Sequence, residues 1–546
     1  MAITEFFDKK HRGRVAFFGV PPDDEALRVF KERAYLIDAE ACSEAQLKDP
    51  QFLMATDSVI FFQNPDKPTQ IDHQLQSHAK KLLNYDCRIY VRVAKSEKLK
   101  DKAREIVVNT LLRLGLPANG LSPNERQMMP LQSRERDGRI LAPYVYVCDT
   151  GMGWLDIAQT IIDNPAGEQP GTSLQIVVTD TDGDGAMAEN AVRELLQAAE
   201  IPEEEVRLLI QRAFHDCLEI RLRQLSGGLS GGMTFHGHYR RSDALLGSRP
   251  SLACFVKIGT RKQIEAEYAS QLGVAVYLPF HLAPRLDLKR CGLGAGFGIL
   301  VGDFVSEAEP LSDCARQGRA VSVIGNLFNK SLSPWIGAST VQSSTSLSVM
   351  LSDLLPKEVP AHRKKMIAEM GAKLTETEMR SIFTALKSGP VRVGLIHGDL
   401  HAKNVLVRGS DALLIDFEKS NGPRPLVYDA ASLEAGLLVE GFLSDARGVN
   451  ELHLSIAALY DLAVIIDWIE PCNPHDRSSW YYECVKQIRM YARQLECEPG
   501  QYASALALAL FKKSCNPTPF KENAEFLRSL AYVLAEKILV ALAKRN

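Results

Sequence analysis

The sequence predicts an α/β region at the N-terminus and, after it, an α+β region that becomes almost wholly helical. Strand-like and helix-like segments alternate over residues 14–116, which is typical of a parallel sheet with helices on both faces. Further along, two strand-like segments flank the glycine-rich turn Leu225–Met233, and beyond Ala430 helical periodicity continues almost to the last residue. The length of 546 residues allows three or four domains, and also two.

Composition and charge narrow the class of protein. The apolar fraction of 46% and the charged fraction of 24% are ordinary for globular proteins. The net charge of −3 gives no reason to expect a nucleic-acid partner. Eleven cysteines without a CxxC pair are typical of a reducing compartment. Neither a secretory signal nor a run of about 18 apolar residues occurs, so we expect a cytoplasmic protein without a membrane partner.

Residues 1–116 are expected to form short buried strands separated by helices. The strand candidates are Arg14–Gly19, the very short Tyr35–Ile37, Asp57–Phe62 and Cys87–Val93. The helix candidates are Asp23–Arg33, Gln70–Leu83 and Lys100–Leu114. Continuous apolar runs such as VIFF fit strands that are buried on both faces.

At the level of fold, this region resembles a receiver or flavodoxin-like domain. A working receiver needs a phosphate-accepting aspartate at the end of its third strand. If Tyr35–Ile37 is the second strand, the third is DSVIFF, which ends in Gln63-Asn64, and Asp23-Asp24 follow the first strand only after several residues. The resemblance therefore implies a phosphorylation-incompetent module for regulation or protein contacts. A generic α/β domain remains an equal alternative.

Residues 117–215 are expected to be a linker followed by a further α/β segment. Residues 117–140 are rich in Pro, Asn, Ser and Arg, which favours a long loop. Strand candidates at Tyr144–Val147 and Leu174–Val178 and a helix candidate at Ala186–Ala199 follow. The pattern leaves open whether they form a separate domain or complete the first sheet.

An acidic turn in this segment resembles the start of a calcium loop. Asp180, Asp182 and Asp184 precede Gly185, but the twelfth position of an EF-hand loop, which needs a glutamate, is Ala191 here. An acidic turn that caps the following helix is the favoured interpretation.

The strongest motif is LIHGDLHAKNVLV at Leu395–Val407, followed by LLIDFE at Leu413–Glu418. Phosphoryl transfer needs a carboxylate that orients the attacking hydroxyl and takes its proton, oxygen ligands for magnesium, and positive charge on the phosphates. Asp399 and Asn404 have the D-x-x-x-x-N spacing of a kinase catalytic loop. Asp416 ends an apolar strand and can face the same metal, because magnesium needs only one or two protein carboxylates beside its phosphate and water ligands.

These motifs resemble the aminoglycoside phosphotransferase and choline kinase superfamily, which has a two-lobed protein-kinase-like fold. The resemblance covers about residues 216–546. It implies Asp399 as the catalytic base, His397 as its support, Asn404 and Asp416 as magnesium ligands, and ATP and Mg²⁺ as cofactors. It also implies that Asp429, at the start of the next helix, braces the catalytic loop. Glu418 is a further candidate metal ligand.

Two features differ from protein kinases. His401 lies where serine/threonine kinases usually carry lysine, and Phe-Glu rather than Phe-Gly follows Asp416. Asp429 follows Asp416 so soon that no long activation segment fits between them.

Upstream residues complete the expected nucleotide site. The glycine-rich turn holds Gly227, Gly228, Gly231 and Gly232, whose backbone N–H groups can approach phosphates closely. Lys257 lies near the end of the apolar strand SLACFVKI and is expected to contact the α- and β-phosphates. Its acidic partner is expected to be Glu267 in preference to Glu265. Residues Gly298–Val305 resemble the strand and hinge that meet the adenine.

The expected lobes are residues 216–305 and the helical residues 306–546, whose helices build the acceptor site in this superfamily. Asp353, Glu376 and Glu378 are candidates for binding a cationic acceptor, or equally exposed helix charges.

The predicted function is ATP- and Mg-dependent transfer of the γ-phosphate to a hydroxyl of a small molecule or protein-bound group. The long N-terminal extension favours a signalling or defence role in a bacterial multi-protein system. The alternatives are a nucleotide-binding switch that acts on protein partners through the N-terminal region, and transfer of AMP. The presence of Asp399 favours catalysis over a pure switch.

Overall fold

The computed structural model divides the chain into two compact units. Unit 1 comprises Met1–Glu265 with Arg285–Phe304, and unit 2 comprises Ala266–Pro284 with Val305–Asn546. The structure describes residues 14–33, 35–54, 56–62, 70–85, 87–94, 96–113, 129–130, 135–136, 139–140, 145–163, 174–179, 203–225, 232–241, 251–293, 297–386, 389–443, 454–468, 479–517 and 522–545. The sequence features that lie outside the described residues are Gln63-Asn64, the acidic turn at 180–185 with the helix candidate 186–199, and Gly227, Gly228 and Gly231.

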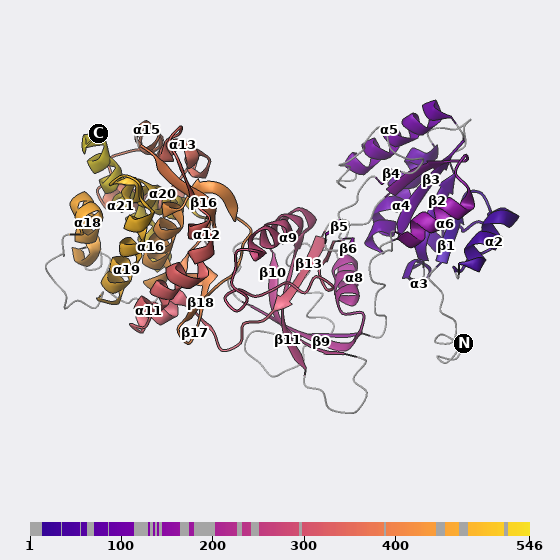
Figure 1. Cartoon of the computed structure of the whole chain (residues 1–546), viewed down its shortest axis with the longest axis horizontal. Helices are drawn as coiled ribbons and strands as arrows, with labels where there is room; N and C mark the ends of the chain where they lie inside the picture. Colours follow the sequence, from indigo (N-terminus) through magenta and orange to yellow (C-terminus); the bar gives the residue numbers. More distant parts are fainter. Residues whose placement is uncertain are drawn as a thin grey trace. The chain divides into compact units, whose positions relative to one another are not determined.

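The first sheet of unit 1 has the strand order β1-β2-β3-β7-β4. Figure 1 labels β1, β2, β3 and β4 of this sheet, in the indigo-to-purple part of the chain. Its strands are β1 (Arg14–Phe18), β2 (Thr56–Phe62), β3 (Arg88–Val93), β7 (Val145–Asp149) and β4 (Met129–Pro130). The first four are parallel to one another, and β4 is antiparallel to β7. The α/β class expected for the N-terminus is therefore confirmed.

Alternating side chains of these strands build a core on each face of the sheet. Val15, Phe17 and Ile60 point towards α2 (Asp24–Glu32) and α6 (Trp154–Asp163). Ala16, Val59 and Phe61 belong to the opposite core, against α4 (Gln70–Asn84) and α5 (Glu97–Arg113). This alternation with period two gives a three-layer arrangement and explains why the strands are apolar throughout.

The expected strand at Tyr35–Ile37 does not form. Only Leu36 makes an isolated parallel bridge, with Arg14 of β1. The physical reason is that the apolar segment is too short to form more than a single bridge.

The second sheet of unit 1 has the order β12-β13-β11-β10-β9-β8. Its strands are β8 (Gln175–Thr179), β9 (Cys217–Gln224), β10 (Met233–Arg241), β11 (Leu252–Thr260), β12 (Gly292–Leu293) and β13 (Phe297–Asp303). Only β8 is parallel to its neighbour; the other pairs are antiparallel. Helix α8 (Glu203–Ala213) adds Val206, Leu209 and Ile210 to the core of this sheet.

The structure divides the described strands and helices of the segment 117–215, whose assignment the sequence left open, between the two sheets. β7 pairs with β3 and, with α6, completes the first sheet. β8 pairs with β9, and α8 packs in the core of the second sheet. β8 lies before residue 216 in the sequence but pairs with β9 after it, so the second sheet begins earlier than the expected limit, and the domain limits themselves stay a prediction. Short β5 (Glu135–Arg136) and β6 (Arg139–Ile140) pair only with each other.

Unit 2 is mainly helical, as the sequence predicts. Its helices are α10 (Leu311–Arg316), α11 (Ala320–Asn326), the π-helix η2 (Leu327–Ser331), α12 (Ser333–Gly337), α13 (Leu347–Met350), α14 (Ala361–Glu369), α15 (Glu376–Ala385), α16 (Val427–Gly441), α18 (Leu462–Asp467), α19 (Ser479–Leu495), α20 (Gln501–Cys515) and α21 (Glu522–Arg545). Short 3₁₀ turns are η3 (Ser352–Leu354), η4 (Ala402–Asn404) and η5 (Ala457–Tyr460). Helix α9 (Arg261–Ala275) begins in unit 1 and ends in unit 2.

Two small sheets of unit 2 carry the catalytic motif. One has the order β14-β17-β18, and the other β15-β16-β19. Their strands are β14 (Glu309–Pro310), β15 (Thr340–Gln342), β16 (Val391–Ile396), β17 (Val405–Arg408), β18 (Asp411–Leu414) and β19 (Asn421–Pro425).

Helices α16, α20 and α21 are buried in the core of this unit. Glu434 of α16 pairs with Arg489 of α19 (2.6 Å) and accepts a hydrogen bond from the Tyr502 hydroxyl of α20 (2.6 Å). Burial of both charges is tolerated because each is bonded several times. Among the helices in the described part of the chain, none has the length and apolar character to cross a bilayer.

Candidate phosphotransfer site

The loop that carries Asp399 begins where β16 ends. Gly398 has a positive φ of 76°, which glycine adopts without strain. A Cβ at this position would overlap the carbonyl oxygen of Lys419. The tight approach of the two backbone segments therefore requires the glycine of the HGD sequence.

Asp429 holds the start of this loop from the first turn of α16. Its carboxylate accepts hydrogen bonds from the backbone N–H groups of His397 (2.7 Å) and Gly398 (3.0 Å). Burial raises the pKa of the Asp429 carboxyl, although these two hydrogen bonds act in the opposite direction. The bracing role expected for Asp429 is confirmed by this geometry.

Ile415, directly before Asp416, is hydrogen-bonded to the catalytic loop through both its backbone carbonyl and its backbone N–H. The Nε2 of the fully buried His397 donates to the Ile415 carbonyl (2.9 Å). The Ile415 N–H donates to the Asn404 carbonyl (3.1 Å). The side-chain amide of Asn404 donates to the carbonyl of Asp399 (3.0 Å), which leaves its oxygen as the atom suited to a cation. The segments of Asp399 and Asp416 are thus held in one fixed arrangement.

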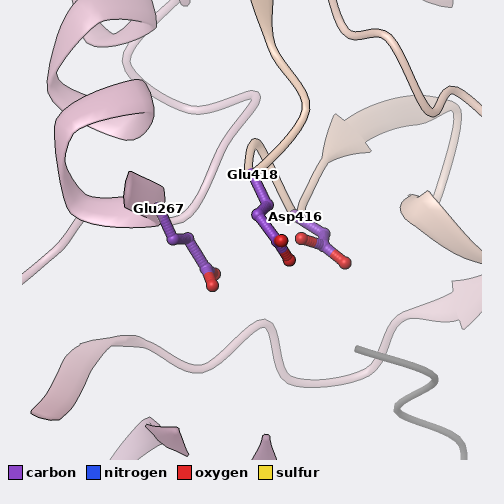
Figure 2. Close-up of side chains that lie close together, drawn as sticks. All are labelled: Glu267, Asp416 and Glu418. Carbon is purple, nitrogen blue, oxygen red and sulfur yellow. The ribbon is translucent and has the colours of Figure 1, made fainter. Parts of the chain in front are cut away.

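Three carboxylates converge at the end of β18 (Figure 2). Asp416, Glu418 and Glu267 each offer a carboxylate oxygen, and these oxygens lie within 4.8 Å of one another. Asp416 has a positive φ of 63°, a conformation that is costly for a non-glycine residue and that concentrates at functional sites. Glu267 comes from α9 and is only 4% exposed. Oxygen donors at this spacing are those of a magnesium or calcium site, so the donor set fits a hard divalent cation.

Asp399 is half-buried and close to several positive charges. Burial raises the pKa of its carboxyl, but the charges of Lys513, His401, Lys512 and His397 outweigh burial, so the pKa lies below its ordinary value. The carboxylate is therefore ionised at neutral pH, the form that can accept a hydroxyl proton.

Glu440 of α16 links the catalytic loop to α20. Its carboxylate accepts from His401 Nδ1 (2.9 Å), from the Lys403 N–H (3.2 Å) and from Lys513 Nζ (3.2 Å). Burial raises the pKa of the Glu440 carboxyl. The charges of Lys513 and His401 act in the opposite direction and outweigh burial, so the pKa is lowered to about 2. Glu440, Lys512 and Lys513 were not among the site residues predicted from the sequence. The only signal was a lysine pair ending the apolar run ALALALF, and nothing in the spacing links it to Asp399.

Of the expected nucleotide-binding residues that the structure describes, Gly232 and Lys257 lie in unit 1. Lys257 is on β11, is only 5% exposed, and pairs in register with Thr234 and Leu300 on the neighbouring strands. Gly232 lies beside it, since a Cβ there would be 3.5 Å from Lys257 Cε. Glu265 also belongs to unit 1 and Glu267 to unit 2, so the pairing of Lys257 with Glu267 stays a prediction.

The chain is similar to several solved structures, each at low sequence identity. An amicoumacin kinase in complex with AMP-PNP, Ca²⁺ and Ami is 12% identical, with 58% of this chain and 88% of that chain covered and a TM-score of 0.36. An aminoglycoside phosphotransferase in ternary complex with AMP-PNP and hygromycin B is 10% identical, with 59% and 93% covered and a TM-score of 0.31. A choline/ethanolamine kinase family protein from Mesorhizobium loti is 16% identical, with 53% and 92% covered and a TM-score of 0.24.

No curated protein matches the sequence. The family model described as "Phosphotransferase enzyme family" matches residues 351–439. His397, Asp399, Asn404, Asp416 and Asp429 all lie inside this stretch. The family resemblance that the motifs predict is confirmed here: the part of the chain that carries the catalytic loop matches the phosphotransferase enzyme family.

Proposed function

We propose that this chain is an ATP- and magnesium-dependent phosphotransferase that moves the γ-phosphate of ATP to a hydroxyl group of a small molecule or a protein-bound group. The observation that carries the proposal is the pair of hydrogen bonds that tie Ile415 to the catalytic loop, one with His397 and one with Asn404. This tie holds the ionised Asp399 and the carboxylate group at Asp416 in a fixed arrangement. Fixed positioning of a base and of metal ligands is most of what phosphoryl transfer asks of a protein.

In the proposed reaction, Asp399 accepts a hydrogen bond from the acceptor hydroxyl and orients it. The hydroxyl oxygen forms a bond to the γ-phosphorus while the bond from that phosphorus to the β–γ bridging oxygen breaks. ADP leaves with that electron pair, and the hydroxyl proton passes to Asp399. A carboxylate with a lowered pKa is a weak base, which suits a loose transition state in which the hydroxyl stays largely protonated.

Asp416 and Asn404 are the proposed magnesium ligands, with Glu418 and Glu267 completing the acidic group. A bound magnesium ion neutralises the charge of the phosphates. Lys257, with the glycine-rich turn, is proposed to contact the α- and β-phosphates.

The test compares the parent protein with Asp399→Ala and Asp416→Ala in Mg-dependent ADP formation and in binding of Mn²⁺ followed by electron paramagnetic resonance. We expect Asp399→Ala to bind Mn²⁺ and nucleotide but to lose about 100-fold or more in turnover. Asp416→Ala should lose Mn²⁺ binding as well. Asp411→Ala is the control, because that aspartate lies on β18 and, among the described residues, its one ion pair is a long contact with Lys330 (3.9 Å).

Equal turnover by the parent and Asp399→Ala, with nucleotide bound by both, would contradict the proposal and favour a nucleotide-binding switch. The mass of the product separates phosphate transfer from AMP transfer.

For the N-terminal sheet we propose a receiver-like regulatory module that acts through protein contacts and accepts no phosphate. The bridge of Leu36 to Arg14 supports this, because it puts the second apolar segment beside β1 on the side away from β2. That order is the flavodoxin-like one, 2-1-3-4-5, with Leu36 in place of the second strand.

A further inference from the structure

The three carboxylates that the sequence offered for a cationic acceptor are all engaged within the fold. Their partners are Arg424 for Asp353 (2.6 Å), Lys364 for Glu376 (3.0 Å) and Thr375 N–H for Glu378 (2.7 Å). The Arg424 contact is bidentate, and the Thr375–Glu378 contact closes a capping box at α15. These side chains therefore serve structure and give no support to a cationic acceptor.

Positive charge, by contrast, is concentrated beside Asp399. His401 lies two residues after it, and α20 brings Lys512 and Lys513 close enough for their charges to act on its carboxyl. The lysine that serine/threonine kinases carry at position 401 is absent, yet the site has cations that arrive from a helix more than a hundred residues away.

The two lysines differ in their partners. Lys513 is almost buried and is neutralised by Glu440 (3.2 Å), which also holds His401. Lys512 is half-buried and donates to the neutral hydroxyl of Tyr428 (3.2 Å), with its Nζ 5.7 Å from the centre of that ring. Among the described residues, no carboxylate lies within 4.0 Å of Lys512 Nζ.

An ammonium has three donors, and a partly buried ammonium whose hydrogen-bond partner is a neutral hydroxyl can gain a stronger, charge-assisted bond from an anionic ligand. The hydrogen bond to Tyr428, which directly precedes Asp429, holds Lys512 near the start of α16, and its charge acts on the Asp399 carboxyl. A ligand with an anionic oxygen next to its reacting hydroxyl would complete the charge pairing.

We propose that the acceptor is a small hydroxyl compound that also carries an anionic oxygen group, a carboxylate or a phosphate, and that Lys512 binds this group. The inference rests on the proposed phosphotransferase function and names the substrate class of the same site.

The experiment measures binding of four sugars to the protein saturated with Mg²⁺ and AMP-PNP, by saturation-transfer NMR and calorimetry. Gluconate and glucose 6-phosphate are the two anionic probes, glucose is the neutral one, and glucosamine is the cationic one. We expect binding of an anionic probe that is at least about tenfold tighter than that of glucose or glucosamine. Comparison of the affinities for gluconate and glucose 6-phosphate distinguishes a carboxylate-binding site from a phosphate-binding site.

Variants assign the binding to Lys512. Lys512→Met should weaken the anionic probe by about tenfold or more, and Lys512→Arg, which keeps the charge, should largely restore it. Lys365→Met is the matched control, because Lys365 has a side chain that is 87% exposed and pairs only with Glu369 across one helical turn.

Failure of both anionic probes to bind, tighter binding of glucose or glucosamine, or equal affinity in Lys512→Met would each overturn the inference. AMP-PNP binding, measured in the same samples, separates the two proposals. If the parent protein does not bind AMP-PNP, that result counts against the phosphotransferase function itself.

Discussion

Glu267 has two candidate roles. The sequence predicts that it holds Lys257, which stays a prediction, and the structure also brings its carboxylate next to those of Asp416 and Glu418 (Figure 2). Three carboxylates at this spacing repel one another strongly unless a cation lies among them. The arrangement therefore favours a direct role for Glu267 in holding the metal.

Replacing Glu267 by glutamine tests this role without nucleotide. Removal of one of three negative charges should weaken Mn²⁺ binding by roughly tenfold, since the ligand charge count sets divalent affinity. The measurement is a Mn²⁺ titration by electron paramagnetic resonance on the free protein, with Glu265→Gln as control, since Glu265 is the neighbouring candidate on α9 that lies outside the carboxylate group. If Glu267→Gln has unchanged Mn²⁺ affinity and a higher KM for ATP, the role of Glu267 is to hold Lys257 and not the metal.

At the scale of elements, helix α16 positions the catalytic loop. Its first turn supplies Asp429, and two turns later Gly436 lies against the loop, where a Cβ would be 2.7 Å from the Cβ of His401. Another turn on, Glu440 binds His401 and Lys513. One face of a single helix thus holds the loop at three points.

Gly436→Ala should therefore separate the helix from the loop. Alanine normally stabilises a helix by about 1 kcal/mol relative to glycine, but the overlap with His401 should reverse this and cost roughly 1–3 kcal/mol. We expect a lower melting temperature and a fall in kcat. Gly273→Ala in α9 is the control, because nothing lies within 4 Å of the added methyl group, and it should be neutral or stabilising. Equal behaviour of the two variants in calorimetry and turnover would show that the close approach is unimportant.

The elements also show what sequence reasoning could reach. Asp399, Asn404, Asp416 and Asp429 lie within one short stretch, so their spacing alone predicts that they meet. Glu440, Lys513 and Glu267 reach the same region on separate helices, and helix packing leaves no mark in local spacing. The prediction of a strand at Tyr35–Ile37 was wrong, because a strand needs pairing along its length and within this segment only Leu36 pairs with β1.

At the scale of the whole molecule, the cores of the chain are separate. The two cores of the first sheet, around Phe61 and Phe17, share no residue with the core of unit 2. Local sequence patterns could not assign residues 144–215 to a sheet, because hydrogen bonding between strands, not the position of a loop, decides which sheet a segment joins. Because the chain divides into two compact units, we predict that the N-terminal sheet, in unit 1, and unit 2 unfold in distinct cooperative transitions.

Two tryptophans make this prediction testable. Trp154 lies in the core shared by α2 and α6, where it packs on Phe17 and under Arg92 (3.7 Å), and Trp335 lies in the core of unit 2 near Phe417. Trp154→Ala should cost about 3–5 kcal/mol and lower one calorimetric transition, while the Mn²⁺ affinity of the Asp416 group stays unchanged. Trp335→Ala should lower a different transition and weaken Mn²⁺ binding with it. A single transition that both variants shift equally would show instead that the chain folds as one cooperative body, and regulation through the N-terminal sheet would then have to act by altering the stability of the catalytic unit.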